Sequence, residues 1–119
     1  IMTDTQAPQT SVAAILQRES KPVTVFTLSW CSYCHAVKSL LDSMRVPYRT
    51  IELDTGMYLD THLHQRMRAE LRQLSGSQTL PQVFVGHDNI GGYTETQAAA
   101  RAGRLQTLLA AKGVAIATP

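Results

Sequence analysis

Apolar side chains form two kinds of pattern along this chain. Short runs rich in β-branched and aromatic residues predict strands. Such runs lie at 23–28 (VTVFTL), 48–53 (YRTIEL) and 82–85 (QVFV), and a short fourth strand closes at Ile90. Elsewhere apolar residues recur every three or four positions, which is typical of amphipathic helices. This spacing predicts helices over 11–20, after Cys34 as far as Met44, from Leu59 to a C-capping Gly76, and over 94–101 and 103–112.

The predicted order of these elements is α-β-α-β-α-β-β-α. The first two strands are joined through a helix, which predicts parallel pairing with a right-handed crossover. The last two are joined by the turn 86–89 (GHDN), which predicts an antiparallel hairpin. We therefore expect an α/β fold with a mixed four-stranded sheet flanked by helices.

The chain has 119 residues, which is room for one domain. We expect a flexible N-terminal arm over 1–10, the domain over 11–113 and a C-terminal tail over 114–119. A net charge of +2 without a basic run argues against a nucleic-acid partner. No apolar stretch is long enough to span a bilayer, and residues 1–10 lack the features of a signal peptide. The expected location is cytoplasmic, or organellar if a transit segment has been removed.

Cys31 and Cys34 are the two cysteines of the chain. A disulfide between them would close a very short loop and remove little entropy from the unfolded state, so it is a poor staple. The spacing therefore points to redox or metal chemistry. Cys31 follows a strand and lies at the start of a helix, where unpaired N–H groups and the helix dipole stabilise a thiolate, the reactive form. Cys34 lies within the first turn, so we expect Cys31 to be the nucleophile and Cys34 the resolving thiol.

Three other interpretations of the cysteines are weaker. With His35 the motif also matches C-x-x-C-H, which attaches haem c, but haem attachment requires export and an all-helical shell. A zinc site needs two more ligands, and His62 and His64 point to different faces of a helix. A purely structural pair is disfavoured by the strand-to-helix junction. His35 is expected to be an exposed residue of the first turn that tunes the nearby thiol.

Two further segments and one aromatic residue support a redox site. Residues 79–81 (TLP) precede the third strand and lie beside the CxxC helix in this topology. A cis peptide bond before Pro81 would leave the Leu80 carbonyl and N–H free to pair with an extended peptide. Residues 91–95 (GGYTE) precede a helix whose N-terminus can hold a carboxylate, and the glycines permit close approach. Trp30 is next to the nucleophile and either shields its sulfur or packs.

In this order and spacing, the motifs resemble the glutaredoxin family over about residues 20–112. WCSYC resembles the dithiol active site of the family, which often has Pro where Ser32 stands. TLPQVFVG resembles its TVP segment, and IGGYTET resembles its GG-x-T/D-D/E glutathione clamp. The resemblance implies a thioredoxin-like fold and a glutathione-dependent thiol–disulfide oxidoreductase.

The resemblance also implies roles for individual residues. Cys31 is the thiol that becomes glutathionylated, the Leu80 backbone pairs with the cysteine of glutathione beside a cis Pro81, and Thr94 and Glu95 hold the γ-glutamyl end. The residues expected to bind glutathione are Tyr33, Arg68, Thr79, Leu80, Pro81, Gly92, Thr94 and Glu95.

The chain departs from the family at two places. Leu28 stands where a Lys or Arg usually favours the thiolate and the glycyl carboxylate of glutathione, and its absence should weaken both effects by about 1 kcal/mol. Matching positions back from Leu80 places Arg68 where a family Gln or Arg meets the same carboxylate, so we expect Arg68 to compensate. Segment 55–67 is also longer than usual and is expected to be a longer solvated helix rather than a partner surface.

We therefore expect an enzyme that reduces glutathione–protein mixed disulfides and protein disulfides. The alternative is a 2Fe-2S cluster carrier, because some glutaredoxins with Ser in place of the active-site Pro bridge such a cluster between two chains. Cys31 of each chain and two glutathiones would supply the four thiolates. The expected partners are glutathione and glutathionylated or disulfide-bonded proteins, and the expected state is a monomer or a cluster-bridged homodimer.

Overall fold

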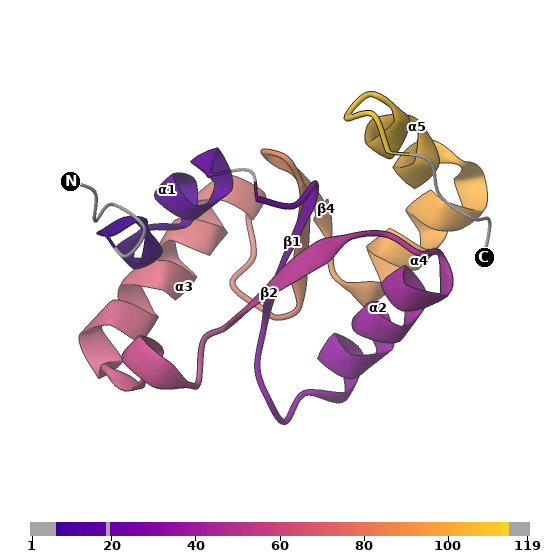
Figure 1. Cartoon of the computed structure of the whole chain (residues 1–119). Coiled ribbons are helices and arrows are strands. Elements are labelled where there is room, and N and C mark those ends of the chain that lie inside the picture. The colour runs from indigo at the N-terminus through magenta and orange to yellow at the C-terminus, as the bar shows by residue number, and fades with distance from the viewer. Residues whose placement is uncertain (1–6, 19, 115–119) are drawn as a thin grey trace.

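The predicted strands form one mixed sheet in a computed structural model that describes residues 7–18 and 20–114 (Figure 1). The strands are β1 (Val23–Thr27), β2 (Tyr48–Glu52), β3 (Gln82–Val85) and β4 (Asp88–Gly91). The helices are α1 (Val12–Gln17), α2 (Ser32–Ser43), α3 (Thr61–Ser75), α4 (Tyr93–Ala102) and α5 (Arg104–Ala110), with 3-10 helices η2 (Ala7–Thr10) and η3 (Gly56–Leu59).

The order of strands across the sheet is β2-β1-β3-β4. β1 pairs parallel with β2 and antiparallel with β3, and β3 pairs antiparallel with β4. Both predicted pairings are therefore confirmed, as is the mixed four-stranded α/β sheet.

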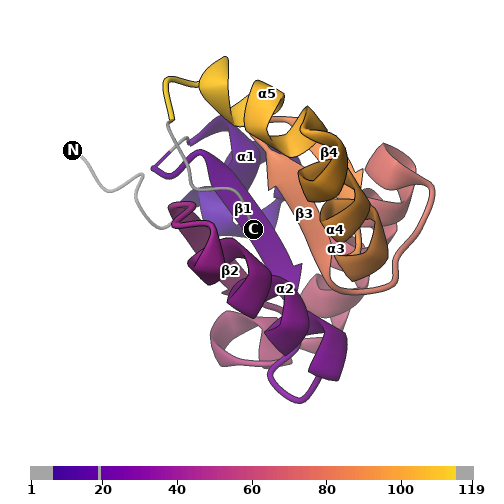
Figure 2. The same ribbon diagram turned by 90° about the vertical axis from the view of Figure 1, so that its right-hand side faces the viewer.

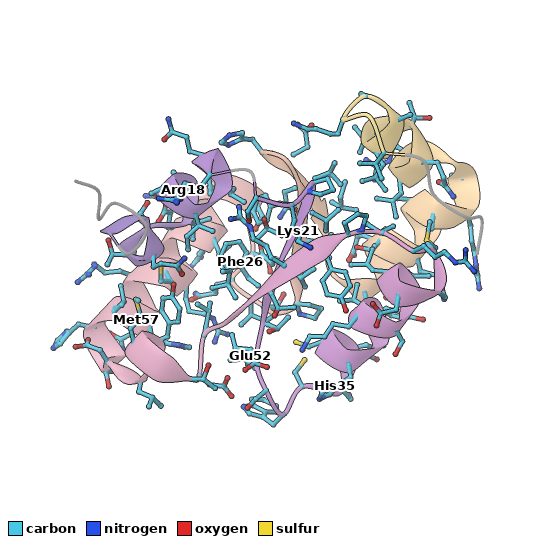
Figure 3. All side chains as sticks on the ribbon, viewed as in Figure 1. Arg18, Lys21, Phe26, His35, Glu52 and Met57 are labelled. Atoms are coloured by element: carbon cyan, nitrogen blue, oxygen red, sulfur yellow. The ribbon has the colours of Figure 1, made fainter. Side chains whose placement is uncertain are left out.

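Helices cover both faces of this sheet. α1 and α3 lie on one side, and α2 and α4 lie on the other, where Figure 2 shows them in front of the strands. β1 is buried along its whole length, so both of its faces carry core side chains. Phe26 packs with α1 and α3, near the centre of the molecule in Figure 3, while Val23 and Val25 pack with α2, α4 and α5.

Segment 55–67 folds into η3 and the first half of α3. Asp60 ends η3 and caps α3, and its side chain accepts a hydrogen bond from the Leu63 N–H at 3.0 Å. α3 therefore begins at Thr61 rather than at the expected Leu59. It ends at Gly76, whose φ of 83° is the left-handed C-cap expected of a glycine.

Part of the expected N-terminal arm is ordered. Residues 7–10 form η2, and the Tyr58 hydroxyl of η3 donates to the Gln9 carbonyl at 2.6 Å. Residues 1–6 of the expected arm and 115–119 of the expected tail lie outside the described residues. No helix formed by the described residues is long and apolar enough to cross a lipid bilayer.

Candidate active site

Cys31 occupies the N-cap of α2, directly after the turn that follows β1. Its backbone is extended, and its Sγ accepts a hydrogen bond from the Cys34 N–H at 3.2 Å. The oxygen of Ser, Thr or Asp usually makes this contact. A sulfur anion at this position accepts the same N–H and meets the positive end of the helix dipole.

The two cysteine side chains differ in their access to solvent. Cys31 keeps 9% of its surface exposed, and Cys34 keeps none. Cys31 Sγ lies 3.8 Å from the Leu80 carbonyl oxygen, to which the thiol donates. Of these two sulfurs, only that of Cys31 is therefore within reach of an external disulfide.

The Cys34 thiol is held in its protonated form. Burial, and after it the contact with Cys31, raises the pKa of Cys34 to about 12. The Leu28 N–H, which donates to Cys34 Sγ at 3.4 Å, lowers this pKa by a smaller amount. The side chain of Leu28, where the resemblance led us to expect a basic residue, is buried in the same core cluster as Cys34. Leu28 is therefore part of the packing beneath the site.

The turn that carries Trp30 and Cys31 is fixed by hydrogen bonds to Ser29. The Asp54 carboxylate accepts from the Ser29 N–H at 3.0 and 3.1 Å and from its hydroxyl at 2.6 Å. The bonds from Ser29 hold the pKa of Asp54 below its usual value. His35 Nε2 donates to the Ser29 carbonyl at 3.1 Å from the first turn of α2 (Figure 3), and the His35 side chain is exposed as expected.

A cleft of about 230 Å³ opens beside the active-site turn. It is lined by Tyr33, Thr79, Leu80, Pro81, Gly92, Tyr93, Thr94 and Glu95. Seven of the eight residues expected to bind glutathione therefore meet in one cleft, and Arg68 is the exception. The Leu80–Pro81 peptide is cis, as expected. No described residue accepts a hydrogen bond from the Leu80 N–H, so this group is free to pair with an extended ligand.

The N-terminus of α4 forms the far side of the cleft. Gly92 is the N-cap, and its N–H donates to the Glu95 carboxylate at 2.9 Å. Gly91 has a φ of 114°, and a Cβ there would lie 2.8 Å from that of Glu95, so the chain needs glycine here. The first N–H groups of α4 have no partner within the helix, which makes this end suitable for a carboxylate.

Aromatic side chains flank the cleft. The Tyr33 and Tyr93 rings lie 6.1 Å apart between centroids, tilted by 32°. Tyr93 was missing from the expected site, although its place between Gly92 and Thr94 could have indicated it. Trp30 and Tyr33 are 75% and 63% exposed, so the hypothesis that Trp30 packs into the fold is wrong.

Arg68 lies on α3, beside the loop that leads to Leu80. Its Nε donates to the Gln78 carbonyl at 2.9 Å, and its Nη1 contacts His64 Nε2 at 3.2 Å. The guanidinium is therefore held at Gln78, the residue before Thr79 of the cleft. Elsewhere on the same helix His62 is exposed, and within residues 7–18 and 20–114 no three His, Cys, Asp or Glu side chains are grouped to hold a metal ion.

Several known proteins have sequences similar to that of this chain. Residues 23–90 match the family model for Glutaredoxin, a region that includes both cysteines and the Leu80–Pro81 peptide. A glutaredoxin from Pseudomonas aeruginosa is 37% identical over 90 residues, which cover 76% of this chain and 98% of that protein. One from Ricinus communis is 36% identical over 94 residues, covering 79% and 87%.

Solved structures agree with these sequence matches. A buckwheat glutaredoxin–glutathione complex has a TM-score of 0.74 and 33% identity, and the match covers 94% of this chain and 97% of that one. Wheat glutaredoxin has a TM-score of 0.72 and 32% identity, with 86% and 91% covered. The expected thioredoxin-like fold is therefore confirmed.

Proposed function

Because the chain belongs to the glutaredoxin family, whose members are thiol oxidoreductases that work with glutathione, we propose that it reduces mixed disulfides between glutathione and proteins through Cys31. The observation that carries this proposal is the position of Cys31. Its sulfur caps α2 and lies 3.8 Å from the carbonyl oxygen of Leu80, a residue that lines the cleft, whereas Cys34 is fully buried.

Glutathione would lie in the cleft as an extended tripeptide. The free N–H and the carbonyl of Leu80 would pair with its cysteine, as a strand edge pairs with a peptide. The γ-glutamyl carboxylate would bind at the N-terminus of α4, and Glu95 would face the ammonium group. Arg68 would hold the glycyl carboxylate. The similar buckwheat glutaredoxin was solved as a complex with glutathione, which supports this assignment.

The reaction consists of two thiolate exchanges. The Cys31 thiolate attacks the glutathione sulfur of the mixed disulfide, a new S–S bond forms at Cys31, and the protein leaves as a thiolate that takes a proton from water. A second glutathione thiolate then attacks the glutathione sulfur on Cys31. Oxidised glutathione leaves, and the Cys31 thiolate is restored.

Protein disulfides require Cys34 as well. After Cys31 attacks, the Cys34 thiol must lose its proton and attack Cys31 Sγ, which releases the second protein thiol and leaves a Cys31–Cys34 disulfide. Cys34 is buried and its pKa is about 12, so this step is expected to be slower than attack by free glutathione.

The test is reduction of a glutathionylated peptide by glutathione in the presence of wild type, Cys31→Ser or Cys34→Ser. We expect no catalysis by Cys31→Ser and retained activity in Cys34→Ser. Loss of activity in Cys34→Ser, with its fold intact, would contradict the monothiol route and place Cys34 in the cycle. Inactive wild type would overturn the proposal.

A second candidate is a 2Fe-2S cluster carrier. Of the two thiols, that of Cys31 alone keeps part of its surface open to solvent, and Ser32 stands where the family often has Pro. Two chains with two glutathiones would therefore hold a cluster, which would supply one-electron storage. Anaerobic reconstitution with iron, sulfide and glutathione should give a brown dimer, and a colourless monomer would contradict this candidate.

A further inference from the structure

His64 and Arg68 lie one turn apart on α3 and are in contact. Arg68 Nη1 donates to His64 Nε2 at 3.2 Å, while Arg68 Nε donates to the Gln78 carbonyl at 2.9 Å. The Nη2 group has no hydrogen-bond acceptor among the described residues. The guanidinium is therefore fixed at two of its nitrogens, and the third remains available for a ligand carboxylate.

The other side of the His64 ring identifies its tautomer. Nδ1 lies 2.5 Å from the Leu53 carbonyl oxygen, just beyond β2. A carbonyl only accepts, so we assign the proton of the neutral ring to Nδ1, which leaves a lone pair on Nε2 for Arg68. The imidazole thus joins the end of β2 to the guanidinium.

We propose that His64 is a positioning residue for glutathione, whose neutral ring orients Arg68 toward the glycyl carboxylate. This inference rests on the proposed function and deepens it, because it names the residue that places Arg68 where Leu28 has replaced the usual basic side chain. It also makes binding dependent on pH. A proton on Nε2 would replace the acceptor by a donor and set a positive charge against the guanidinium.

The other titratable groups near His64 do not replace this contact. Asp54 follows β2 and interacts electrostatically with His64, but hydrogen bonds from Ser29 occupy its carboxylate and keep its pKa low. The Tyr58 hydroxyl of η3 donates to Gln9, and burial raises its pKa, so it stays neutral. Asp60 caps α3 through the Leu63 N–H. These three groups therefore leave His64 Nε2 as the acceptor for Arg68.

The experiment measures the affinity of the full chain for S-methylglutathione, which cannot undergo exchange, by NMR titration. At neutral pH we expect His64→Ala to weaken binding about threefold to tenfold, and to raise the KM for a glutathionylated peptide with kcat unchanged. His64→Gln should restore both values, because its amide oxygen can accept from Arg68. His62→Ala, an exposed histidine on the same helix, should match wild type.

The pH profile separates positioning from a structural role. Wild-type affinity should fall as the pH is lowered from about 8 to about 5.5, while that of His64→Gln should stay flat. If His64→Ala unfolds, the pH profiles of wild type and His64→Gln still test the inference. Parallel profiles would overturn the inference, as would an effect of His64→Ala that persists undiminished in an Arg68→Ala background. Absence of both binding and activity in wild type would instead overturn the proposed function.

Discussion

Cys31 and Cys34 belong to one helical turn, yet their surroundings divide the work between them. Cys31 uses its sulfur to cap the helix, where it accepts a hydrogen bond from the Cys34 N–H. Cys34 lies three residues further along the chain and has no contact with water, which penalises its charged form. The motif therefore supplies one thiol that solvent reaches and one that is fully buried.

We expect iodoacetamide at neutral pH to modify Cys31 alone in the folded protein. Cys34 is neither accessible nor ionised, because burial raises its pKa to about 12. Mass spectrometry should find one adduct on folded protein and two after unfolding in urea. Equal labelling rates for the two native thiols would contradict this assignment.

The raised pKa of Cys34 also predicts the direction of a stability change. The unfolded chain releases this proton near the ordinary pKa of 9.0, before the folded chain does. The contribution of Cys34 to folding is thus fully present below about pH 9 and is lost as the pH rises further. Cys34→Ser should therefore show a shallower alkaline decline in denaturant unfolding than wild type.

Asp54 is expected to position the active-site turn. Asp54→Ala removes every hydrogen bond that Ser29 donates to it, so we expect kcat/KM for peptide reduction to fall about threefold to tenfold through misplacement of Cys31. Ser29→Ala keeps the backbone bond and should lose less. Asp88→Ala, an exposed aspartate on β4, is the matched control. Because the folded pKa of Asp54 is lowered, this contact persists above about pH 4 and is lost as the pH falls through the folded value.

At the level of elements, α1 depends on α3 for its start. Glu70 of α3 accepts hydrogen bonds from the N–H groups of Val12 and Ala13, at 2.7 and 2.8 Å, and from the Ser11 hydroxyl. A helix of six residues is too short to be stable alone, so this cap joins it to the domain.

We expect Glu70→Ala to lower the free energy of unfolding by about 1 kcal/mol, the usual cost of a lost cap. Thermal or denaturant unfolding would measure it. Glu52→Ala, which removes a surface ion pair with Lys38 at 3.8 Å, should cost less than that. Peptide reduction should be unchanged in Glu70→Ala, and a matching fall in activity would contradict a purely structural role.

Periodicity predicted the elements that bury one face, whereas local hydrogen bonds determine the short 3-10 helix and the exact start of α3. Leu63, Met67 and Leu71 made α3 recognisable because they form its buried stripe. η3 was not predicted, and α3 was predicted to begin two residues too early, at Leu59. The Tyr58–Gln9 contact and the Asp60 cap determine these two features, and neither contact leaves a periodic pattern. β4 begins at Asp88, earlier than Ile90 alone indicated, because pairing with β3 extends it.

At the scale of the whole molecule, the cleft combines segments that are far apart in the chain. Residues 31–34 carry the proposed nucleophile and Tyr33 of the cleft, and residues 79–81 and 92–95 complete the cleft. Each segment carries a motif of its own, so the sequence indicated nearly the whole cleft. Contacts between unlike segments carried no motif: Asp54 with Ser29, and His64 with Leu53 and Arg68, required the folded chain.

The core that carries these segments should respond strongly to Phe84. Its ring meets that of Phe26 edge-on, with centroids 5.7 Å apart, on the face covered by α1 and α3. Phe84→Ala should lower the free energy of unfolding by about 3 to 5 kcal/mol, measured by urea titration. Phe84→Leu should lose distinctly less, and equal losses would show that ring volume does not determine packing there.

Trp30 is the single tryptophan of the chain, and it projects into solvent beside the reactive sulfur. The molecule therefore carries its own optical probe at the proposed site of disulfide exchange. Its emission should change when Cys31 is joined to glutathione and return when the thiol is released. Each half of the catalytic cycle can thus be timed by stopped-flow fluorescence on the unlabelled, unmutated protein.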